Sequence, residues 1–285
     1  MNYTLKDIAE MCGGTLHPQS ESGRVFTTVD SDSRKIKAST TLFAALRGDN
    51  FDGHSFVSAL CKEGGALIDD PNYFCPNSIL VESVKKALYT IAFRHRNEKL
   101  SGLKVLAVTG SVGKTTVKNM AALVMGAKYR VYKSAGNRNS LTGLPMEVLN
   151  IPTDTEWAVL EAGMSDPGEI AQISRLIKPN AAIITNIGHS HILAFGSREG
   201  ICAEKLSIVE GMENSLLVMP NEPLIKNSTV SIDEAVYCGA QGCGCNACYK
   251  NVGEESGITE FTACYNDKET VIKLPASGIH NVQNA

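Results

Sequence analysis

The stretch VTGSVGKTT, Val108–Thr116, decides the fold class of this chain. It follows an apolar run that begins at Lys104, and a helical pattern starts near Lys114, so the order strand, loop, helix is predicted. Glycines at 110 and 113 allow a tight turn whose backbone N–H groups can face an anion. The stretch therefore predicts a phosphate-binding loop, although Val108 stands where the general pattern has its first glycine.

Each residue type in this loop suits a nucleotide phosphate. The Lys114 ammonium can reach the β- and γ-phosphates, and the Thr115 hydroxyl can ligate magnesium. A loop of this kind indicates nucleotide binding without indicating which reaction follows, and a chance Gly-Lys-Thr turn is the alternative. The residues expected to bind the nucleotide are Gly110, Ser111, Val112, Gly113, Lys114, Thr115 and Thr116.

Further buried strands are predicted after the loop. The apolar runs WAVLEAGM (157–164), AAIITNIG (181–188) and SLLVMP (215–220) alternate with helical patterns at 167–177 and 199–212. Such alternation is typical of an α/β fold whose mostly parallel sheet is flanked by helices.

The first hundred residues have shorter elements. Strands are predicted at 24–30, 41–46, 65–70 and 78–82, and helices at 5–12, 55–64 and 84–100. The polar stretch RNEKLSG (96–102) reads as a linker. We therefore predict an α/β domain over residues 1–101 and a central P-loop domain over residues 102–285.

Composition narrows the class of protein. Of the 285 residues, 43% are hydrophobic and 20% charged, with a net charge of -3, as in ordinary globular proteins. No basic face predicts a nucleic-acid partner, and no signal peptide or long apolar run predicts membrane insertion, so we expect a cytoplasmic protein.

The cysteines form one local cluster. An odd total of nine favours reduced thiols over a disulfide framework. Four cysteines lie close together in the sequence: Cys238, Cys243, Cys245 and Cys248. They could bind zinc, or they could belong to a cysteine-rich surface loop. Their spacing is irregular, so we predict no structural zinc.

Polar residues follow the predicted strands. Glu161 ends one strand, and Asn186, His189 and His191 follow the next, at the sheet edge where ligands bind. A carboxylate and an imidazole there could share metal ions with phosphates, or could be solvated loop groups. Lys205 lies among apolar helix residues, either snorkelling to water or with a desolvated amine.

Several motifs in order resemble the Mur ligases: TGSVGKTT, EAGMSDPGEI, TNIGHSH and SGIHNVQNA. The stretches SAGNRNSLTGLP and DSRKIKASTTLFAALRGDNFDGHSF are most similar to the branch that adds D-alanyl-D-alanine. The resemblance implies an ATP-dependent amide ligase of peptidoglycan precursor synthesis. In it, ATP phosphorylates the carboxylate of UDP-N-acetylmuramoyl tripeptide, and the amine of D-alanyl-D-alanine attacks the acyl phosphate.

The resemblance also assigns roles. Lys114, Lys205 and His191 would be catalytic, with Lys205 carbamylated. Two Mg²⁺ sites would use Thr115 with Glu161, and His191 with Lys205. The remaining assignments are Asn137 and Asn139 near the phosphates and substrate, His280 and Asn281 on the adenine side, and Ser33 and Arg34 at the uridine diphosphate.

The family pattern continues beyond Ala285 into a third, Rossmann-like domain. The chain is therefore expected to be a truncated, monomeric piece that is inactive by itself. Three alternatives stay open: a sister ligase that adds a diamino acid, a related folate or cyanophycin ligase, and a P-loop binding module without ligation.

Overall fold

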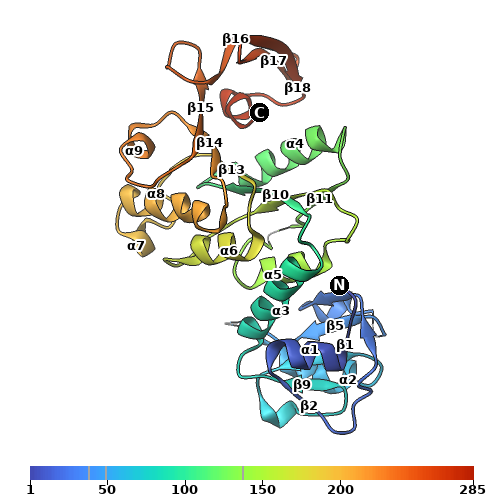
Figure 1. Ribbon diagram of the computed structural model, residues 1–285. Coiled ribbons are helices and arrows are strands. Elements are labelled where there is room, and N and C mark those ends of the chain that lie inside the picture. The colour runs from blue at the N-terminus through green and yellow to red at the C-terminus, as the bar shows by residue number, and fades with distance from the viewer. Residues whose placement is uncertain (38, 49, 137) are drawn as a thin grey trace. The chain divides into compact units, whose positions relative to one another are not determined.

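The strand that leads into the phosphate loop, β10 (Lys104–Thr109), lies inside a nine-stranded sheet. This computed structural model describes residues 1–285 except Ala38, Asp49 and Asn137, and all counts refer to the described residues (Figure 1). Contacts divide the chain into two compact units. Unit 1 comprises residues 1–103 and 135–155, and unit 2 comprises residues 104–134 and 156–285.

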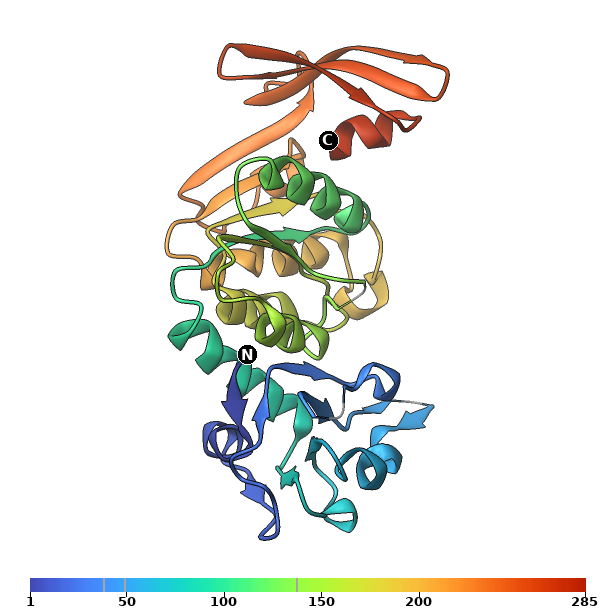
Figure 2. The same ribbon diagram turned by 90° about the vertical axis from the view of Figure 1, so that its right-hand side faces the viewer.

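The sheet of unit 2 is mostly parallel. Neighbouring strands are parallel from β11 to β16, and only β16, β17 and β18 pair in antiparallel fashion. Figure 2 shows these last strands as a twisted ribbon above the short C-terminal helix. The spatial order is β11 (Val131–Lys133), β12 (Trp157–Glu161), β10, β13 (Ala181–Ile184), β14 (Leu216–Pro220), β15 (Glu234–Ala240), β16 (Ala247–Glu255), β17 (Ile258–Tyr265) and β18 (Lys268–Leu274).

Helices cover both faces of this sheet. The connection from β10 to β11 moves across the sheet in one direction, and that from β12 to β13 moves in the other. Because parallel crossovers are right-handed, α4 and α6 lie on opposite faces, as Figure 1 shows. The helices of unit 2 are α4 (Lys114–Gly126), α6 (Glu169–Ile177), α7 (Ile192–Phe195), α8 (Arg198–Leu206), α9 (Pro223–Lys226) and α10 (Ile279–Asn284), with a 3-10 turn, η4 (Ser207–Gly211).

Apolar strand residues hold α4 against the sheet. Val108 and Val159 are fully buried and pack with Val117 of α4. Complete burial of one such side chain stabilises the fold by about 1.5–3 kcal/mol. This packing fixes the start of α4 directly after β10, and thereby fixes the loop between them.

Unit 1 has a smaller, five-stranded sheet. Its spatial order is β2 (Thr15–Leu16), β9 (Ser78–Leu80), β8 (Gly65–Ile68), β5 (Thr41–Ala44) and β4 (Thr28–Asp30), with only the first pair antiparallel. Two short ladders join β1 (Tyr3–Thr4) to β3 (Val25–Phe26) and β6 (Arg47–Gly48) to β7 (Phe51–Asp52). The helices are α1 (Leu5–Cys12), α2 (Val57–Leu60), α3 (Val84–Glu98) and α5 (Gly143–Asn150), with 3-10 turns η1 (Ser33–Lys35), η2 (Gly53–Phe56) and η3 (Pro71–Tyr73).

The predicted fold class is confirmed, since both units combine mostly parallel sheets with flanking helices. The division of the chain differs from the predicted one, because residues 135–155 pack with unit 1. Helix α5 is the reason: it is buried from Gly143 to Leu149 and contacts α3 and β4 of that unit. Among the described residues, no helix is long and apolar enough to cross a bilayer.

Candidate functional site: a phosphate loop at the edge of the parallel sheet

The phosphate loop lies where the strand order of unit 2 reverses direction. Strand β10 has β12 on one side and β13 on the other, and the chain leaves β10 toward β11 but returns toward β13. In parallel sheets, ligands bind beyond the carboxyl end of such a strand. The loop residues Gly110–Gly113 begin directly after β10, so their position matches that of a nucleotide site.

Gly110 is required by the space around it. Its φ is +143°, and a Cβ at this position would lie 1.9 Å from the Thr185 hydroxyl oxygen. Gly113 has a φ of +84° and is the N-cap of α4, where no side chain caps the helix. The first N–H groups of α4 are therefore not bonded by a capping side chain, which suits a helix terminus that receives a phosphate.

Residues after β13 brace the loop. The Asn186 side-chain oxygen accepts from the backbone N–H groups of Ser111 and Val112, both at 3.1 Å. The Thr185 hydroxyl donates to the carbonyl of Val112 at 2.5 Å. The Ser111 hydroxyl in turn accepts from the N–H of Gly188 at 2.8 Å. Sequence placed Asn186 at this edge, and the structure adds that it shapes the loop directly.

Lys114 folds back over the loop. Its ammonium lies 2.9 Å from the Gly110 carbonyl oxygen and 3.4 Å from that of Ser111. Burial lowers the pKa of Lys114, and the nearby carboxylate of Glu161 opposes this shift. A cation held on the loop backbone in this way is ready to turn toward an anion.

Thr115 and Glu161, which the resemblance assigns to one magnesium ion, are hydrogen-bonded to each other. The Thr115 hydroxyl donates to Glu161 Oε2 at 2.8 Å, and the Glu161 residue is 4% exposed. A hydroxyl and a carboxylate oxygen are hard donors of the kind that Mg²⁺ prefers, so these two side chains fit the ion.

Lys118 is a site residue that sequence reasoning missed. Its ammonium lies 3.5 Å from Glu161 Oε2 and donates to the Ser134 carbonyl at 2.9 Å, with only 2% of the residue exposed. It follows Lys114 by one helical turn, and this spacing on the face of α4 that meets the sheet was the available signal. Lys118 therefore balances the charge of a buried carboxylate.

The Lys205 side chain is buried, including its terminal amine. The residue is 2% exposed, and its Nζ lies 3.7 Å from the sulfur of Met164. Burial, and after it the charge of Lys114, lowers the pKa of Lys205 to about 8. These features fit the desolvated amine of the two sequence alternatives, because a snorkelling head would reach water.

The two candidate histidines that follow β13 lie at the surface. His191 is exposed with a φ of +67° and is the N-cap of α7, and His189 is exposed just before it. Among the described residues, no three His, Cys, Asp or Glu side chains converge as a metal site.

Helix α10 carries the predicted adenine-side residues. His280 is exposed, and the half-buried Asn281 donates through its side chain to the Ser277 carbonyl at 2.8 Å. Asn284, which sequence reasoning did not single out, reaches the loop: a Cβ on Gly113 would lie 2.6 Å from its Oδ1. This end of α10 therefore lies beside the phosphate loop.

The predicted substrate residues belong to unit 1. Ser33 and Arg34 start η1, where the side chain of Arg34 is 87% exposed and donates twice to Asp32, at 2.8 and 2.9 Å. Asn139 is half-buried in the same unit. Asn137 lies outside the described residues.

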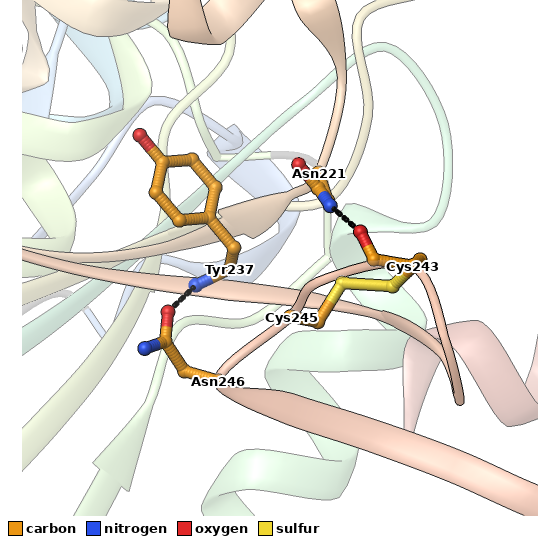
Figure 3. The surroundings of a disulfide bond; sticks show 5 residues. All are labelled: Asn221, Tyr237, Cys243, Cys245 and Asn246. Carbon is orange, nitrogen blue, oxygen red and sulfur yellow. Dashed lines mark hydrogen bonds between the residues drawn. A yellow bond between two sulfur atoms is a disulfide. The ribbon is translucent and has the colours of Figure 1, made fainter.

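The cysteine cluster contains a disulfide where reduced thiols were expected. Cys243 and Cys245 are bonded, as Figure 3 shows, whereas Cys238 and Cys248 are free. The turn between β15 and β16 brings the two Cα atoms to 5.6 Å, inside the range that a disulfide needs.

A phosphate loop after the reversing strand of a parallel sheet defines the class as P-loop nucleotide-binding α/β proteins. Residues 108–285 match the model of the Mur ligase middle domain. The chain therefore belongs to the Mur ligase family, as the motifs predicted.

The similar relatives point to one branch of the family. The UDP-N-acetylmuramoyl-tripeptide--D-alanyl-D-alanine ligase of Bacillus subtilis is 42% identical over 99% of this chain and 62% of its own length. A MurF crystal structure from Acinetobacter baumannii superposes with a TM-score of 0.86 at 26% identity, over 100% of this chain and 63% of that one. The Thermotoga maritima MurF ligase in complex with ADP gives 0.79 at 28% identity, over 90% of this chain and 60% of that one. The chain thus spans about three-fifths of these relatives.

Proposed function

We propose that the complete protein is a cytoplasmic, ATP-dependent ligase that adds D-alanyl-D-alanine to UDP-N-acetylmuramoyl tripeptide. The observation that carries this proposal is a P-loop, with Thr115 bonded to Glu161, in a chain similar along its length to ligases of that name. A carboxylate is a poor electrophile until phosphorylation gives one of its oxygens a leaving group. ATP would form the acyl phosphate, and the amine would then displace phosphate to form the amide.

The loop residues have defined parts in this reaction. The Lys114 ammonium and the N–H groups at the start of α4 would bind and orient the phosphates. Thr115 and Glu161 would hold Mg²⁺, which supplies charge neutralisation during phosphoryl transfer. His191 remains a proposed ligand of a second ion. The Lys118 ammonium, 3.5 Å from Glu161 Oε2, would balance the charge of this carboxylate.

Lys205 is proposed to carry a carbamate. Carbamylation needs a neutral amine, and the burial that lowers the Lys205 pKa to about 8 supports this role by raising the neutral fraction of the amine. Lys205→Ala in the complete enzyme should lose most activity and regain part of it with a short carboxylic acid. Full activity of the variant without any added acid would contradict the role.

The uridine diphosphate end is proposed to bind in unit 1. Arg34 is exposed, and its guanidinium can exchange its contacts with Asp32 for phosphate oxygens. By calorimetry, Arg34→Ala should weaken binding of the UDP-linked peptide by about tenfold, since a charge-assisted bond is worth roughly 1.5–3 kcal/mol. Arg94→Ala, at an exposed position of α3, is the matched control. Equal affinities of the two variants would place the site elsewhere.

The ligase assignment is tested in the complete protein with a panel of amines. Lys114→Ala should lower D-alanyl-D-alanine addition by at least about a hundredfold while circular dichroism stays unchanged. Lys128→Ala, just after the same helix, should retain activity. Preferred use of a diamino acid would indicate a sister ligase. ATP binding without any amide product would indicate a binding module.

A further inference from the structure

The connection between β15 and β16 is unusually short. Residues 241–246 join two strands that are parallel neighbours, with Cys238 opposite Ala247 and Gly239 opposite Cys248. Parallel neighbours usually need a connection of about a dozen residues or more. Gly242 and Gly244 make the return possible, because their φ angles of +88° and +73° favour glycine.

The loop is held in place at both ends without help from sulfur. The Asn221 side chain donates to the Cys243 carbonyl, and Asn246 Oδ1 accepts from the Tyr237 N–H at 3.0 Å (Figure 3). The Cys243 N–H also donates to the Ala240 carbonyl at 3.2 Å. These bonds keep the two cysteines near each other whether or not their sulfurs are joined.

Gly239 provides the space for the sulfur pair. A Cβ at this position would lie 2.8 Å from the Sγ of Cys243 and 2.9 Å from that of Cys245. Both distances are closer than such atoms normally approach, so only glycine leaves room for the two sulfurs on this strand. Strand β15, the turn of residues 241–246 and the hydrogen bonds of Asn221 and Asn246 together form a site shaped for this pair of sulfurs.

The bond contributes little to stability. It joins residues that are two apart, and a disulfide that closes so small a loop restricts the unfolded chain only slightly. The hydrogen bonds already fix the loop, so a structural role does not account for the pair. Cytosolic disulfides are most often transient or redox-sensing.

We infer that Cys243 and Cys245 form a reversible thiol–disulfide exchange site for low-molecular-weight disulfides and dithiols. Cys243 is exposed and Cys245 is half-buried, so Cys243 is the sulfur that outside reagents reach first. Its thiolate attacks one sulfur of a disulfide RSSR, and one RS⁻ leaves. The Cys245 thiolate then attacks the Cys243 sulfur and displaces the second RS⁻. The protein dithiol is oxidised, and RSSR is reduced to two RSH.

The site is tested with the 285-residue chain in buffers of glutathione and glutathione disulfide. Free thiols are alkylated under native conditions, and tandem mass spectrometry maps the tryptic peptide Asn227–Lys250. We expect a Cys243–Cys245 bond that forms and breaks reversibly as the buffer ratio changes, while Cys238 and Cys248 stay alkylated. Three outcomes would overturn the proposal: pairing with another cysteine, complete alkylation at every ratio, or a bond that excess dithiothreitol cannot reduce in the folded protein.

Three variants test the space that Gly239 leaves for the sulfurs and the order in which the two thiolates react. Gly239→Ala should shift the exchange equilibrium toward the dithiol by about tenfold or more, because the added Cβ would crowd both sulfurs of the disulfide. Gly253→Ala is the matched control, since a Cβ there meets nothing within 4 Å. Cys245→Ser should trap glutathione on Cys243 faster than Cys243→Ser traps it on Cys245. An unshifted equilibrium in Gly239→Ala, or equal trapping rates, would contradict the proposed geometry.

Discussion

At the scale of single residues, buried ionisable side chains affect stability at two places, and the first is an ion pair. Lys118 and Glu161 form an ion pair with side chains 2% and 5% exposed, and Lys118 also donates to the Ser134 carbonyl. Removing water from two charges is costly, and only mutual pairing with good hydrogen bonds offsets that cost. Loss of either partner therefore leaves an uncompensated charge beside the phosphate loop.

Lys118→Met should lower the free energy of unfolding of unit 2 by about 3–5 kcal/mol, as expected when one partner of a buried pair is removed. Urea denaturation measures the change. The double variant Lys118→Met with Glu161→Gln should recover part of the loss, because no buried charge remains unpaired. Strictly additive losses in this double-mutant cycle would show that the two groups do not interact.

His95 is a buried ionisable side chain that the fold holds in its neutral form. It is 1% exposed, its Nδ1 lies 2.9 Å from the Tyr3 hydroxyl, and burial lowers its pKa to about 4. The unfolded chain takes up this proton near pH 6.5, whereas the folded chain resists it down to about pH 4. The stability contribution is therefore complete above pH 6.5 and is lost as the pH falls toward 4.

The slope of the unfolding free energy against pH gives the number of protons that the chain takes up on unfolding. In His95→Gln, this slope between pH 6.5 and 4 should correspond to about one proton fewer than in the parent chain. Urea titrations at several pH values give this slope. His189→Gln, at an exposed histidine of unit 2, should retain the slope of the parent chain. If both variants had the parent slope, a neutral buried His95 would be ruled out.

At the scale of elements, helix α6 depends on a cap from another helix. Its N-cap is Gly168, which has no side chain to offer. Glu204 of α8 accepts from the Gly168 N–H at 2.8 Å and from the Ile170 N–H at 2.9 Å. A carboxylate at a helix N-terminus also interacts favourably with the helix dipole. One side chain thus joins α6 and α8 on the same face of the sheet.

Glu204→Ala should destabilise unit 2 by about 1–2 kcal/mol, the usual cost of losing an N-cap. Hydrogen exchange should rise first in the opening turn of α6. Glu204→Gln should lose less, since its amide oxygen still accepts one bond. Glu213→Ala, at an exposed position after η4, is the control. Unchanged exchange at Gly168 and Ile170 would show that the cap is dispensable.

At the scale of the whole molecule, unit 1 is discontinuous in sequence. Helix α5 comes after the first strands of unit 2 and yet supplies a buried face to unit 1. The Asn150 side chain accepts from the Val29 N–H at 2.9 Å and donates to the Val29 carbonyl at 2.8 Å, beside the edge strand β4. The ammonium of Met1 donates to the Leu149 carbonyl at 2.7 Å.

Residues 1–103 by themselves should therefore fold poorly, because α3 and β4 would expose the apolar surface that α5 covers. Joining residues 135–155 to them through a flexible linker should restore cooperative unfolding. Thermal melts followed by circular dichroism compare the two chains. A cooperative transition of residues 1–103 at the same temperature as that of the joined chain would show that α5 is not part of this unit.

Local features of this protein could be predicted from its amino-acid sequence. The loop Val108–Thr116, the strands around it and the α/β class follow from residue type, spacing and period, which depend on a few neighbours along the chain. Glu161 was found in the same way, because parallel strands place their carboxyl ends at one edge. The family was recognised from the resemblance of its motifs.

Contacts between residues that are far apart in the sequence became evident in the folded structure. Lys118 looks like any helix lysine until the carboxylate after β12 lies beside it, and Glu204 shows no capping signal along its own helix. The predicted domain of residues 102–285 included the segment of α5, which packs with unit 1, because the sequence does not show which unit a later segment packs against. The pairing of Cys243 with Cys245 likewise depends on the short turn between the parallel strands β15 and β16, and on the space beside the sulfurs that Gly239 leaves because it has no side chain. Burial and charge pairing depend on the neighbours of a residue in space, and residue type and local spacing do not identify those neighbours.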